Sequence, residues 1–210
     1  MENKRKEERT LAHFTKKAII VTFLELLNKY SLDKITVKDI VDTCGVNRNT
    51  FYYYYKDIYD LIDDVFAIEI NRVINDETHF DTFYDELHRV ALLAVENKTA
   101  IAHIYYSKSR DVLDNYLFTI SKNLVKNFAR SEIDRQQLID TDIEFVCDFY
   151  AHSLVGIILD WIKGISQTDS VEFLKKIAVV LESTLPVALR DTSACDKVWF
   201  LDTFVIMFSF

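Results

Sequence analysis

Apolar residues recur every three or four positions along most of the chain, which is the period of an amphipathic helix. In residues 10–30 the predicted apolar stripe consists of Phe14, Ala18, Val21, Leu24 and Leu27. Further runs predict helices at 36–44, 48–55, 58–75, 80–97, 99–107, 110–130, 138–163 and 170–189, with turns at 131–135 and 164–170 among the connections. The pattern therefore predicts an all-α fold.

The segment between residues 36 and 57 carries the signals that begin and end short helices. Thr36 and Asp39 have the spacing of a capping box, in which the hydroxyl and the carboxylate each bond the other residue's backbone N–H. Gly45 is expected to stop the first helix in a left-handed conformation. Asn47 and Asp57 can cap the two helices that follow. We therefore predict a helix, a tight turn and a second helix, followed by a long helix.

The composition favours helices and a reducing compartment. Only three glycines and one proline occur in 210 residues, and no glycine-rich phosphate loop is present. Because the three cysteines, Cys44, Cys147 and Cys195, are far apart and odd in number, we expect no disulfide framework and a cytoplasmic location. Asp148 and His152 have a spacing that permits metal ligation, but without a third ligand we expect a hydrogen-bonded histidine and no metal.

The charge is unevenly distributed along the chain. The net charge is −8, but residues 1–60 have a balance of +2 and residues 61–210 a balance of −10. The first part can approach an anion, whereas the second should repel nucleic acid. We expect two domains, 1–65 and 66–210, whose boundary falls inside a helix so that they are joined rigidly. No stretch reads as a membrane-spanning helix, so no membrane partner is expected.

Apolar residues around Gly45 have the spacing of a DNA-binding helix-turn-helix. Ile40 lies five residues before the glycine, Val46 directly after it and Phe51 six after it. Such residues hold the two helices at a fixed angle, which lets the second helix enter a major groove. Val41 stands where a small alanine is usual, and the helix pair must accommodate it.

The second helix offers side chains suited to reading DNA. Arg48 can bond guanine and Asn49 can bond adenine, while Thr50 or the backbone N–H groups at the helix start can bind phosphate. Phe51 and Tyr55 are expected to face inward, and the other tyrosines to reach phosphates or thymine methyl groups. The full set of candidate DNA contacts is Thr36, Asn47, Arg48, Asn49, Thr50, Tyr52, Tyr53, Tyr54 and Lys56.

The segment "KITVKDIVDTCGVNRNTFYYYYKDIYDLI" resembles the DNA-binding domain of the TetR family of bacterial transcriptional regulators. The matching positions are Thr36, Val37, Ile40, Gly45, Val46, Thr50, Phe51, Tyr52, Asp57 and Leu61. The chain departs from the family pattern at Val41, at Tyr55 and at Ile58, where a phosphate-contacting lysine is usual; Lys56 is close enough to substitute. Residues 149–164, "FYAHSLVGIILDWIKG", resemble the penultimate helix of a subgroup related to the dihydroxyacetone-kinase operon activator.

The resemblance implies a homodimer that binds a palindromic, double-stranded operator and changes its grip when a small effector binds. It implies a repressor, with an activator or co-activator of a metabolic operon as the alternative. Two other hypotheses stay open: a helical protein–protein adaptor, and a small-molecule sensor that has lost DNA binding. No arrangement of nucleophile and base indicates catalysis, so we expect neither an enzyme nor a cofactor.

The C-terminal part supplies candidate effector and dimer contacts. We expect an effector pocket between the helices at 58–75, 80–97, 99–107 and 110–130, with contacts from Phe83, His88, His103, Tyr106 and Tyr116. The helices at 138–163 and 170–189 are too apolar to be covered within one protomer, which predicts a four-helix dimer interface. Its candidate residues are Phe149, Leu154, Ile158, Trp161, Leu174, Ile177 and Leu181. The apolar segment 195–210 is expected to pack on its own domain or on the partner.

Overall fold

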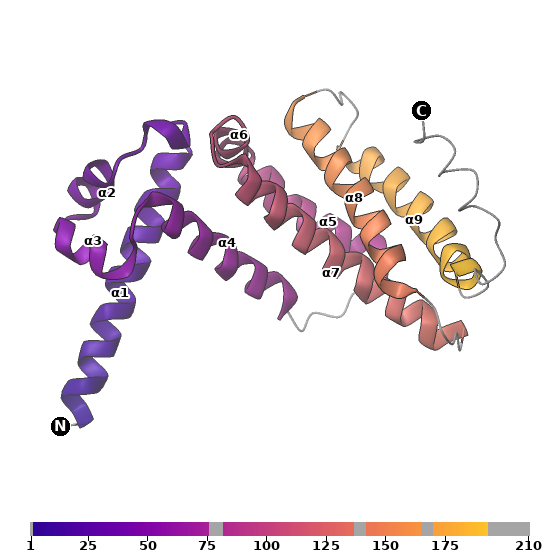
Figure 1. The fold of residues 1–210 in the computed structure, drawn as a ribbon, viewed down its shortest axis with the longest axis horizontal. Helices are drawn as coiled ribbons and strands as arrows, with labels where there is room; N and C mark the ends of the chain where they lie inside the picture. Colours follow the sequence, from indigo (N-terminus) through magenta and orange to yellow (C-terminus); the bar gives the residue numbers. More distant parts are fainter. Residues whose placement is uncertain (1, 76–81, 137–141, 165–169, 193–210) are drawn as a thin grey trace, which may run out of the picture.

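All regular elements in the described part of the chain are helices, which confirms the predicted all-α class (Figure 1). The computed structural model describes residues 2–75, 82–136, 142–164 and 170–192. The α-helices are α1 (Glu2–Leu27), α2 (Val37–Cys44), α3 (Arg48–Tyr54), α4 (Ile58–Ile74), α5 (Phe83–Glu96), α6 (Lys98–Tyr105), α7 (Arg110–Gln136), α8 (Ile143–Ile162) and α9 (Ser170–Thr192), with a short 3-10 turn at Leu32–Lys34. Segment 195–210 lies outside the described residues.

The local signals around the first short helices are confirmed. The Thr36 hydroxyl accepts from the backbone N–H of Asp39 at 3.3 Å, and the Asp39 carboxylate accepts from the backbone N–H of Thr36 at 2.9 Å. Gly45 ends α2 with φ +73°, a left-handed conformation that a residue with a Cβ adopts at a cost. The side chains of Asn47 and Asp57 cap α3 and α4 as expected.

Two helices differ from their predicted bounds or faces. Residues 131–135 are not a turn, because α7 continues through them to Gln136. The segment lacks glycine and proline, and the Ser131 hydroxyl donates to the Phe128 carbonyl inside the helix. In α1 the predicted stripe is wrong at Phe14 and Val21, which are exposed, while Ile19 and Phe23 are fully buried. Packing on α2 and α6 sets the buried face of α1. This face is rotated around the helix axis from the apolar stripe that the sequence predicts.

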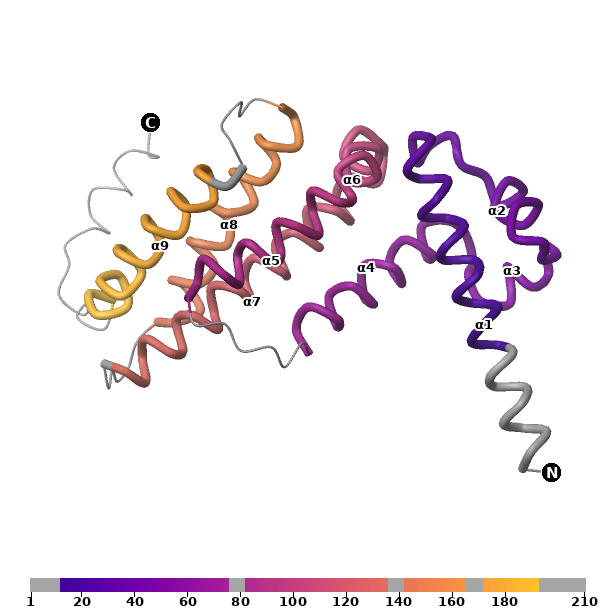
Figure 2. The backbone as a smooth tube through the Cα atoms, turned by 180° about the vertical axis from the view of Figure 1, so that it is seen from behind, coloured from indigo at the N-terminus to yellow at the C-terminus, as the bar shows by residue number. Residues whose placement is uncertain are grey.

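The apolar interior consists of two clusters. The first joins α1–α4 to α6, the start of α7 and the end of α8, and the second joins α5, the rest of α7, the first part of α8 and α9. Figure 2 shows α5 lying over α7, with α9 beside α8. Because the first cluster spans both sides of residue 65, helices α1–α4 share an apolar core with the bundle; the boundary at 65 and the rigid joining of the two parts stay predictions.

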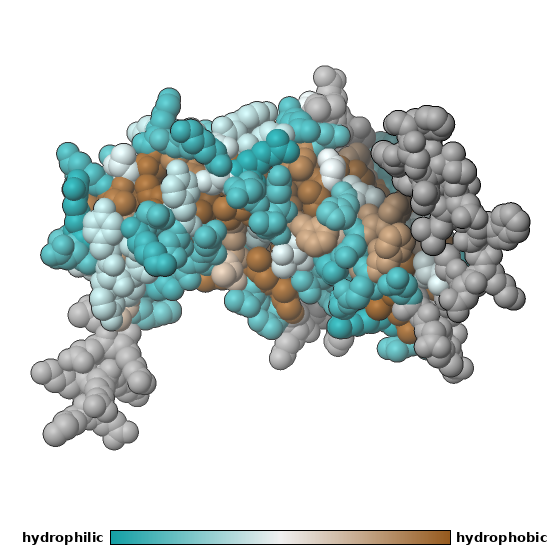
Figure 3. Space-filling view, viewed as in Figure 1, coloured by the Kyte–Doolittle hydropathy of each residue, from teal (hydrophilic) through white to brown (hydrophobic). Residues whose placement is uncertain are grey.

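Helix α8 is long and apolar enough to cross a membrane, by length and composition alone. We expected no membrane-spanning helix from the sequence, but α8 does meet the criteria of length and composition for one. Here α8 packs along α7 and α9 as one member of the helical bundle. Its outer face remains partly apolar, and Figure 3 shows hydrophobic surface over this part of the molecule.

Candidate nucleic-acid interface and ligand pocket

Helix α3 is held at its base by buried apolar side chains. Ile40 of α2 and Phe51 of α3 have no exposed surface, and Val46 of the turn is half-buried against the same cluster. Val41, which replaces the usual alanine, is also buried and is accommodated between the helices. The exposed side of α3 is therefore free to meet a partner while its inner side is fixed.

The start of α3 leaves two long polar side chains unengaged. The Asn47 carboxamide oxygen accepts from the backbone N–H of Thr50 at 2.8 Å and from its hydroxyl at 3.1 Å. Arg48 and Asn49 are exposed, and neither bonds to any other residue in the described part of the chain. The two side chains predicted to read bases can therefore reach outward at no cost in internal bonds.

The four consecutive tyrosines divide into two outward and two inward side chains. Tyr52 is 54% exposed and Tyr53 79% exposed. The Tyr54 hydroxyl donates to the carbonyl of Ala12 on α1 at 3.1 Å, and the Tyr55 hydroxyl donates to the Asp64 carboxylate on α4 at 2.8 Å. Because its only proton is used on α1, Tyr54 is removed from the set of DNA contacts.

Tyr55 belongs to a three-residue polar network that sequence reasoning missed. The Asp64 carboxylate also accepts from the Lys16 ammonium group, with 2.9 Å between Nζ and Oδ2. Burial, together with the hydrogen bond to Asp64, raises the pKa of Tyr55 above its ordinary value, so the phenol keeps its proton. The network ties α1, the end of α3 and α4 together, and it explains why the chain tolerates Tyr55 where the family has phenylalanine.

Thr36 and Lys56 were also predicted to contact DNA, and Ile58 departs from the family pattern. The Thr36 hydroxyl donates to the Asp39 carboxylate at 2.5 Å, which leaves it no proton for a phosphate, so Thr36 is removed from the set. The Thr36 hydroxyl and backbone N–H together hold the pKa of Asp39 below its usual value. The Lys56 side chain is exposed beside α3, whereas Ile58, where the family has a lysine, packs half-buried on the first core.

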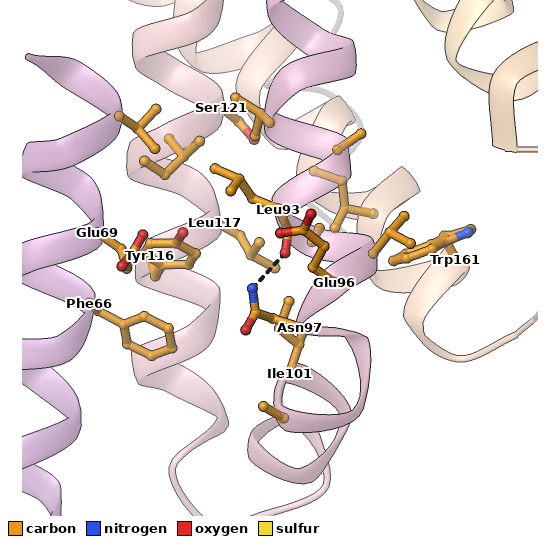
Figure 4. A pocket seen from close by; sticks show the side chains of 18 of the residues that line it. Phe66, Glu69, Leu93, Glu96, Asn97, Ile101, Tyr116, Leu117, Ser121 and Trp161 are labelled. Atoms are coloured by element: carbon orange, nitrogen blue, oxygen red, sulfur yellow. Dashed lines mark hydrogen bonds between the residues drawn. The ribbon is translucent and has the colours of Figure 1, made fainter. Parts of the chain in front are cut away.

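A pocket of about 330 Å³ opens between the helices of the bundle (Figure 4). Its walls come from α4, α5, α6 and α7, as the predicted effector site required, and also from α1, α8 and α9. Tyr116 lines it, and so do the unpredicted residues Phe66, Glu69 and Arg72 of α4. The sequence did contain a signal for these α4 residues. The apolar helix predicted at 58–75 continues well past the helix-turn-helix, toward the C-terminal part.

The other four predicted effector contacts lie outside this pocket. Phe83 is buried in the second core, and His88 stacks on Tyr84 with 5.7 Å between ring centroids. Nδ1 of His103 lies 2.6 Å from the carbonyl oxygen of Leu27, so this side chain joins α6 to the end of α1. Tyr106 is largely exposed. We therefore withdraw these four residues as effector contacts.

The predicted dimer residues occupy both faces of α8 and α9. Phe149 is 60% exposed, whereas Leu154 and Leu181 are buried inside the protomer. The other four are half-buried, and all of them line the pocket: Ile158, Trp161, Leu174 and Ile177. The apolar side chains that do face outward on the two helices are Phe145, Phe149, Val179, Val180 and Val187. The apolar positions of α8 thus serve two faces, and the sequence did not show which residue belonged to which.

The possible metal pair is part of the helix packing. His152 packs on the Phe118 ring with 4.6 Å between centroids, and Asp148 binds Lys122 at 2.5 Å. Among the described residues, no three histidine, cysteine or acidic side chains are grouped to hold a metal ion.

The fold and the exposed second helix define a helix-turn-helix regulator, and comparison with known proteins gives the family. The family model for bacterial regulatory proteins of the tetR family matches residues 19–65, and a model for a transcriptional regulator C-terminal region matches residues 81–183. The chain belongs to the TetR family and is a transcriptional regulator, not an enzyme. Regulators of this family bind DNA and typically form dimers.

Relatives of known function and structure are similar over most of the chain. The HTH-type dhaKLM operon transcriptional activator DhaS of Lactococcus lactis is 26% identical over 148 residues, which cover 68% of this chain and 76% of that protein. A solved dihydroxyacetone kinase operon activator DhaS has a TM-score of 0.64 at 21% identity, covering 82% of this chain and 97% of that one. Salmonella enterica GusR has a TM-score of 0.56 at 16% identity, over 83% and 95%. The two structures share the fold.

Proposed function

We propose that this regulator binds a palindromic operator as a homodimer in the cytoplasm, with one α3 in the major groove of each half-site, and that it represses transcription there. The observation that carries the proposal is the exposed start of α3, where Arg48 and Asn49 extend from a helix whose inner side is fixed by Phe51. A rigid base is what base readout requires, because hydrogen bonds to base edges demand a fixed register.

The contacts follow from the chemistry of the exposed groups. Arg48 bonds guanine and Asn49 bonds adenine in the major groove. Tyr52, Tyr53 and Lys56 contact phosphates or thymine methyl groups and set the position of the helix. The Asn47 carboxamide nitrogen and the backbone N–H groups at the start of α3 bind a phosphate, a role suited to a helix N-terminus.

The exposed apolar faces of α8 and α9 form the dimer interface in this proposal. Phe145 and Phe149 lie one helical turn apart on α8, and Val180 and Val187 continue the apolar surface on α9. Gly156 is exposed on the same side of α8, and nothing within 4 Å would meet a Cβ there, so a partner helix can approach closely. Pairing the two helices with their copies gives a four-helix bundle about a two-fold axis.

The pocket is the effector site in this proposal, and α4 couples it to the reading head. Phe66 and Glu69 of α4 line the pocket, while Asp64 and Asp60 of the same helix accept hydrogen bonds from the Tyr55 hydroxyl and the Lys56 backbone N–H, directly after α3. A ligand that moves α4 therefore moves α3 with it. In a two-fold dimer, this changes the distance between the two reading helices.

The test is selection of bound DNA from a random pool with the full-length protein. We expect enrichment of two inverted half-sites about one helical turn apart, and an affinity that falls steeply with salt as phosphate contacts release counterions. A pool that shows no enrichment, or binding that is insensitive to salt, would contradict the proposal. The latter is what an apolar protein-binding groove would give.

A second candidate is activation of a metabolic operon, which the likeness to the Lactococcus activator DhaS favours. The two candidates share every contact with DNA and differ in where the operator lies relative to the promoter. A reporter placed behind the selected operator in its native promoter separates them. Repression predicts that loss of the protein raises expression, and activation predicts that it lowers expression.

A further inference from the structure

The walls of the pocket are mostly apolar, so its few polar groups decide what it can hold. Leucine, isoleucine, valine, alanine and aromatic side chains supply nearly all of the lining. A ligand that enters must therefore bury apolar surface along most of its length. The uncharged polar groups in this lining are the hydroxyls of Tyr116 and Ser121 on α7, the Trp161 indole and the Asn97 carboxamide, whose nitrogen donates to the Leu93 carbonyl.

Ser121 is a buried residue whose hydroxyl has no internal partner within the described residues. The residue is only 4% exposed and lines the pocket (Figure 4). Helical serines commonly donate to a carbonyl one turn back, as Ser131 of the same helix does to Phe128. Within the described residues, Ser121 makes no such bond and no other polar contact. The Ser121 oxygen is not fully enclosed by protein, so it is available to a hydrogen-bonding ligand in the pocket.

Tyr116 provides a second free hydroxyl toward α4. Its ring stacks on Phe66 with 4.4 Å between centroids and 20° between planes, which fixes the direction of the phenol. Burial, with the nearby carboxylate of Glu69, raises the pKa of Tyr116 to about 12, so the group remains a proton donor. No residue in the described part of the chain accepts this proton. Tyr116 and Ser121 are five positions apart, about 7.5 Å along the helix axis, so they meet different parts of a ligand.

Three charged side chains line the pocket, Glu69, Arg72 and Glu96. Arg72 and Glu69 pair with each other on α4, with 3.4 Å between Nη1 and Oε2. The ammonium group of Lys98 lies 4.7 Å from the centroid of the Trp161 ring, so that aromatic face already holds a cation. A carboxylate ligand would find no unpaired cation and would meet Glu69 and Glu96 in the lining. A cationic group could pair only with Glu96, an exposed carboxylate of the lining that makes no ion pair within the described residues, because Glu69 is held by Arg72.

We propose that the pocket binds an uncharged, mostly apolar ligand that carries two separated oxygen atoms, one bonded by Ser121 and the other by Tyr116. This inference rests on the proposal that the pocket is the effector site, and it adds the chemical class of the effector. Ser121 and Tyr116 are ligand-binding residues in this assignment, and Phe66 positions the Tyr116 ring.

The experiment compares three eight-carbon probes that differ only in their two end groups. Octane-1,8-diol, octanedioate and octane-1,8-diamine are each titrated into the full-length protein, and binding is followed by ligand-observed NMR. We expect the diol to bind, and the dicarboxylate and diamine to bind at least about tenfold more weakly. The dicarboxylate meets no unpaired cation, and the diamine finds only Glu96 for its two ammonium groups, so each buries at least one charge without a partner. Tighter binding of either charged probe would overturn the proposed ligand class while leaving the pocket as a site.

Matched substitutions test the two hydroxyl groups. Ser121→Ala and Tyr116→Phe should each weaken the diol by about three- to tenfold, the usual effect of one neutral hydrogen bond. Ser131→Ala, on the same helix but outside the pocket, should leave the affinity unchanged. Equal affinity in all three variants, or no binding of the diol to wild type, would overturn the inference. Operator binding measured on the same samples without probe tests the proposed function separately, because it does not depend on the probe.

Discussion

At the scale of single residues, identical side chains in a row acquire different roles from the contacts available to them. The hydroxyl groups of Tyr52 and Tyr53 make no hydrogen bond within the described residues and both side chains remain exposed, whereas the hydroxyls of Tyr54 and Tyr55 donate to a carbonyl and a carboxylate on other helices. The inward direction of Tyr55 was predictable because it lies one turn after Phe51. The bond of Tyr54 was not, since its acceptor on Ala12 is 42 positions away in the sequence.

The first prediction distinguishes a residue that reads a DNA base from a residue that positions the protein on the phosphate backbone. Arg48→Ala should relax the preference at one or two base pairs, at about 1–3 kcal/mol for a bidentate contact. Tyr52→Phe should weaken binding to every sequence by a similar factor, because a phosphate contact carries no sequence information. The measurement is the selected sequence profile of each variant. Arg130→Ala, an exposed arginine on α7, is the control; a profile unchanged by Arg48→Ala would withdraw its role.

The second prediction concerns the network of Tyr55, Asp64 and Lys16. Tyr55→Phe removes a hydrogen bond to a carboxylate in a partly buried site. The free energy of unfolding, measured with denaturant, should therefore fall by about 1–2 kcal/mol. Tyr53→Phe removes the same atom from an exposed ring and should change the free energy of unfolding by less than about 0.5 kcal/mol. Equal effects of the two substitutions would show that the bond to Asp64 does not stabilise the fold.

At the scale of elements, signals whose two partners are close in sequence were predicted well. The capping box of α2, the left-handed Gly45 and the Asn47 cap each depend on groups within a few residues of one another. The predicted buried face of α1 was wrong because that face is decided by packing against distant helices. The predicted end of α7 was wrong because residues 131–135 contain no glycine or proline to stop the helix. Tyr116 was predicted from the sequence as a pocket residue. Ser121 was not, because its place in the lining depends on how the helices of the bundle pack together.

The third prediction tests the capping box as a unit. Thr36→Ala removes both hydrogen bonds of the hydroxyl, and loss of an N-cap side chain typically costs about 1 kcal/mol. The pKa of Asp39 is lowered in the folded protein, so its contribution is present above its unfolded pKa and is lost as the pH falls through the lower folded value. Melting curves at neutral pH and at a pH well below about 4, where Asp39 is protonated in the folded protein too, should therefore differ more between wild type and variant at neutral pH. A constant difference would mean that the carboxylate is not involved.

At the scale of the whole molecule, one protomer leaves apolar surface that its own chain does not cover within the described residues. That surface lies on α8 and α9, on the side away from the pocket, with Phe145, Phe149, Val179, Val180 and Val187 exposed. The opposite sides of the same helices are buried in the second core or line the pocket. A single pair of helices thus bounds the ligand site on one side and presents a surface for a partner on the other, so both functions place apolar residues on α8.

The last prediction is that this surface forms a dimer through the outward residues and not through the inward ones. A stable two-fold interface of helices buries about 2,000 Å² or more in total, and Phe149 lies where each copy would bury it. Phe149→Asp should then place an unpaired carboxylate in the interface and weaken the dimer by about 3–5 kcal/mol. Because Phe149 is exposed in the protomer, the helical circular-dichroism signal should persist. Leu92→Asp, at an apolar position on α5 that is 48% exposed against 60% for Phe149, is the control and should remain a dimer. Sedimentation at micromolar concentration distinguishes the two variants.

Two outcomes would contradict the prediction. A wild type that sediments as a monomer while binding its operator tightly would show that there is no such interface. Dissociation by Leu92→Asp alone would place the interface elsewhere.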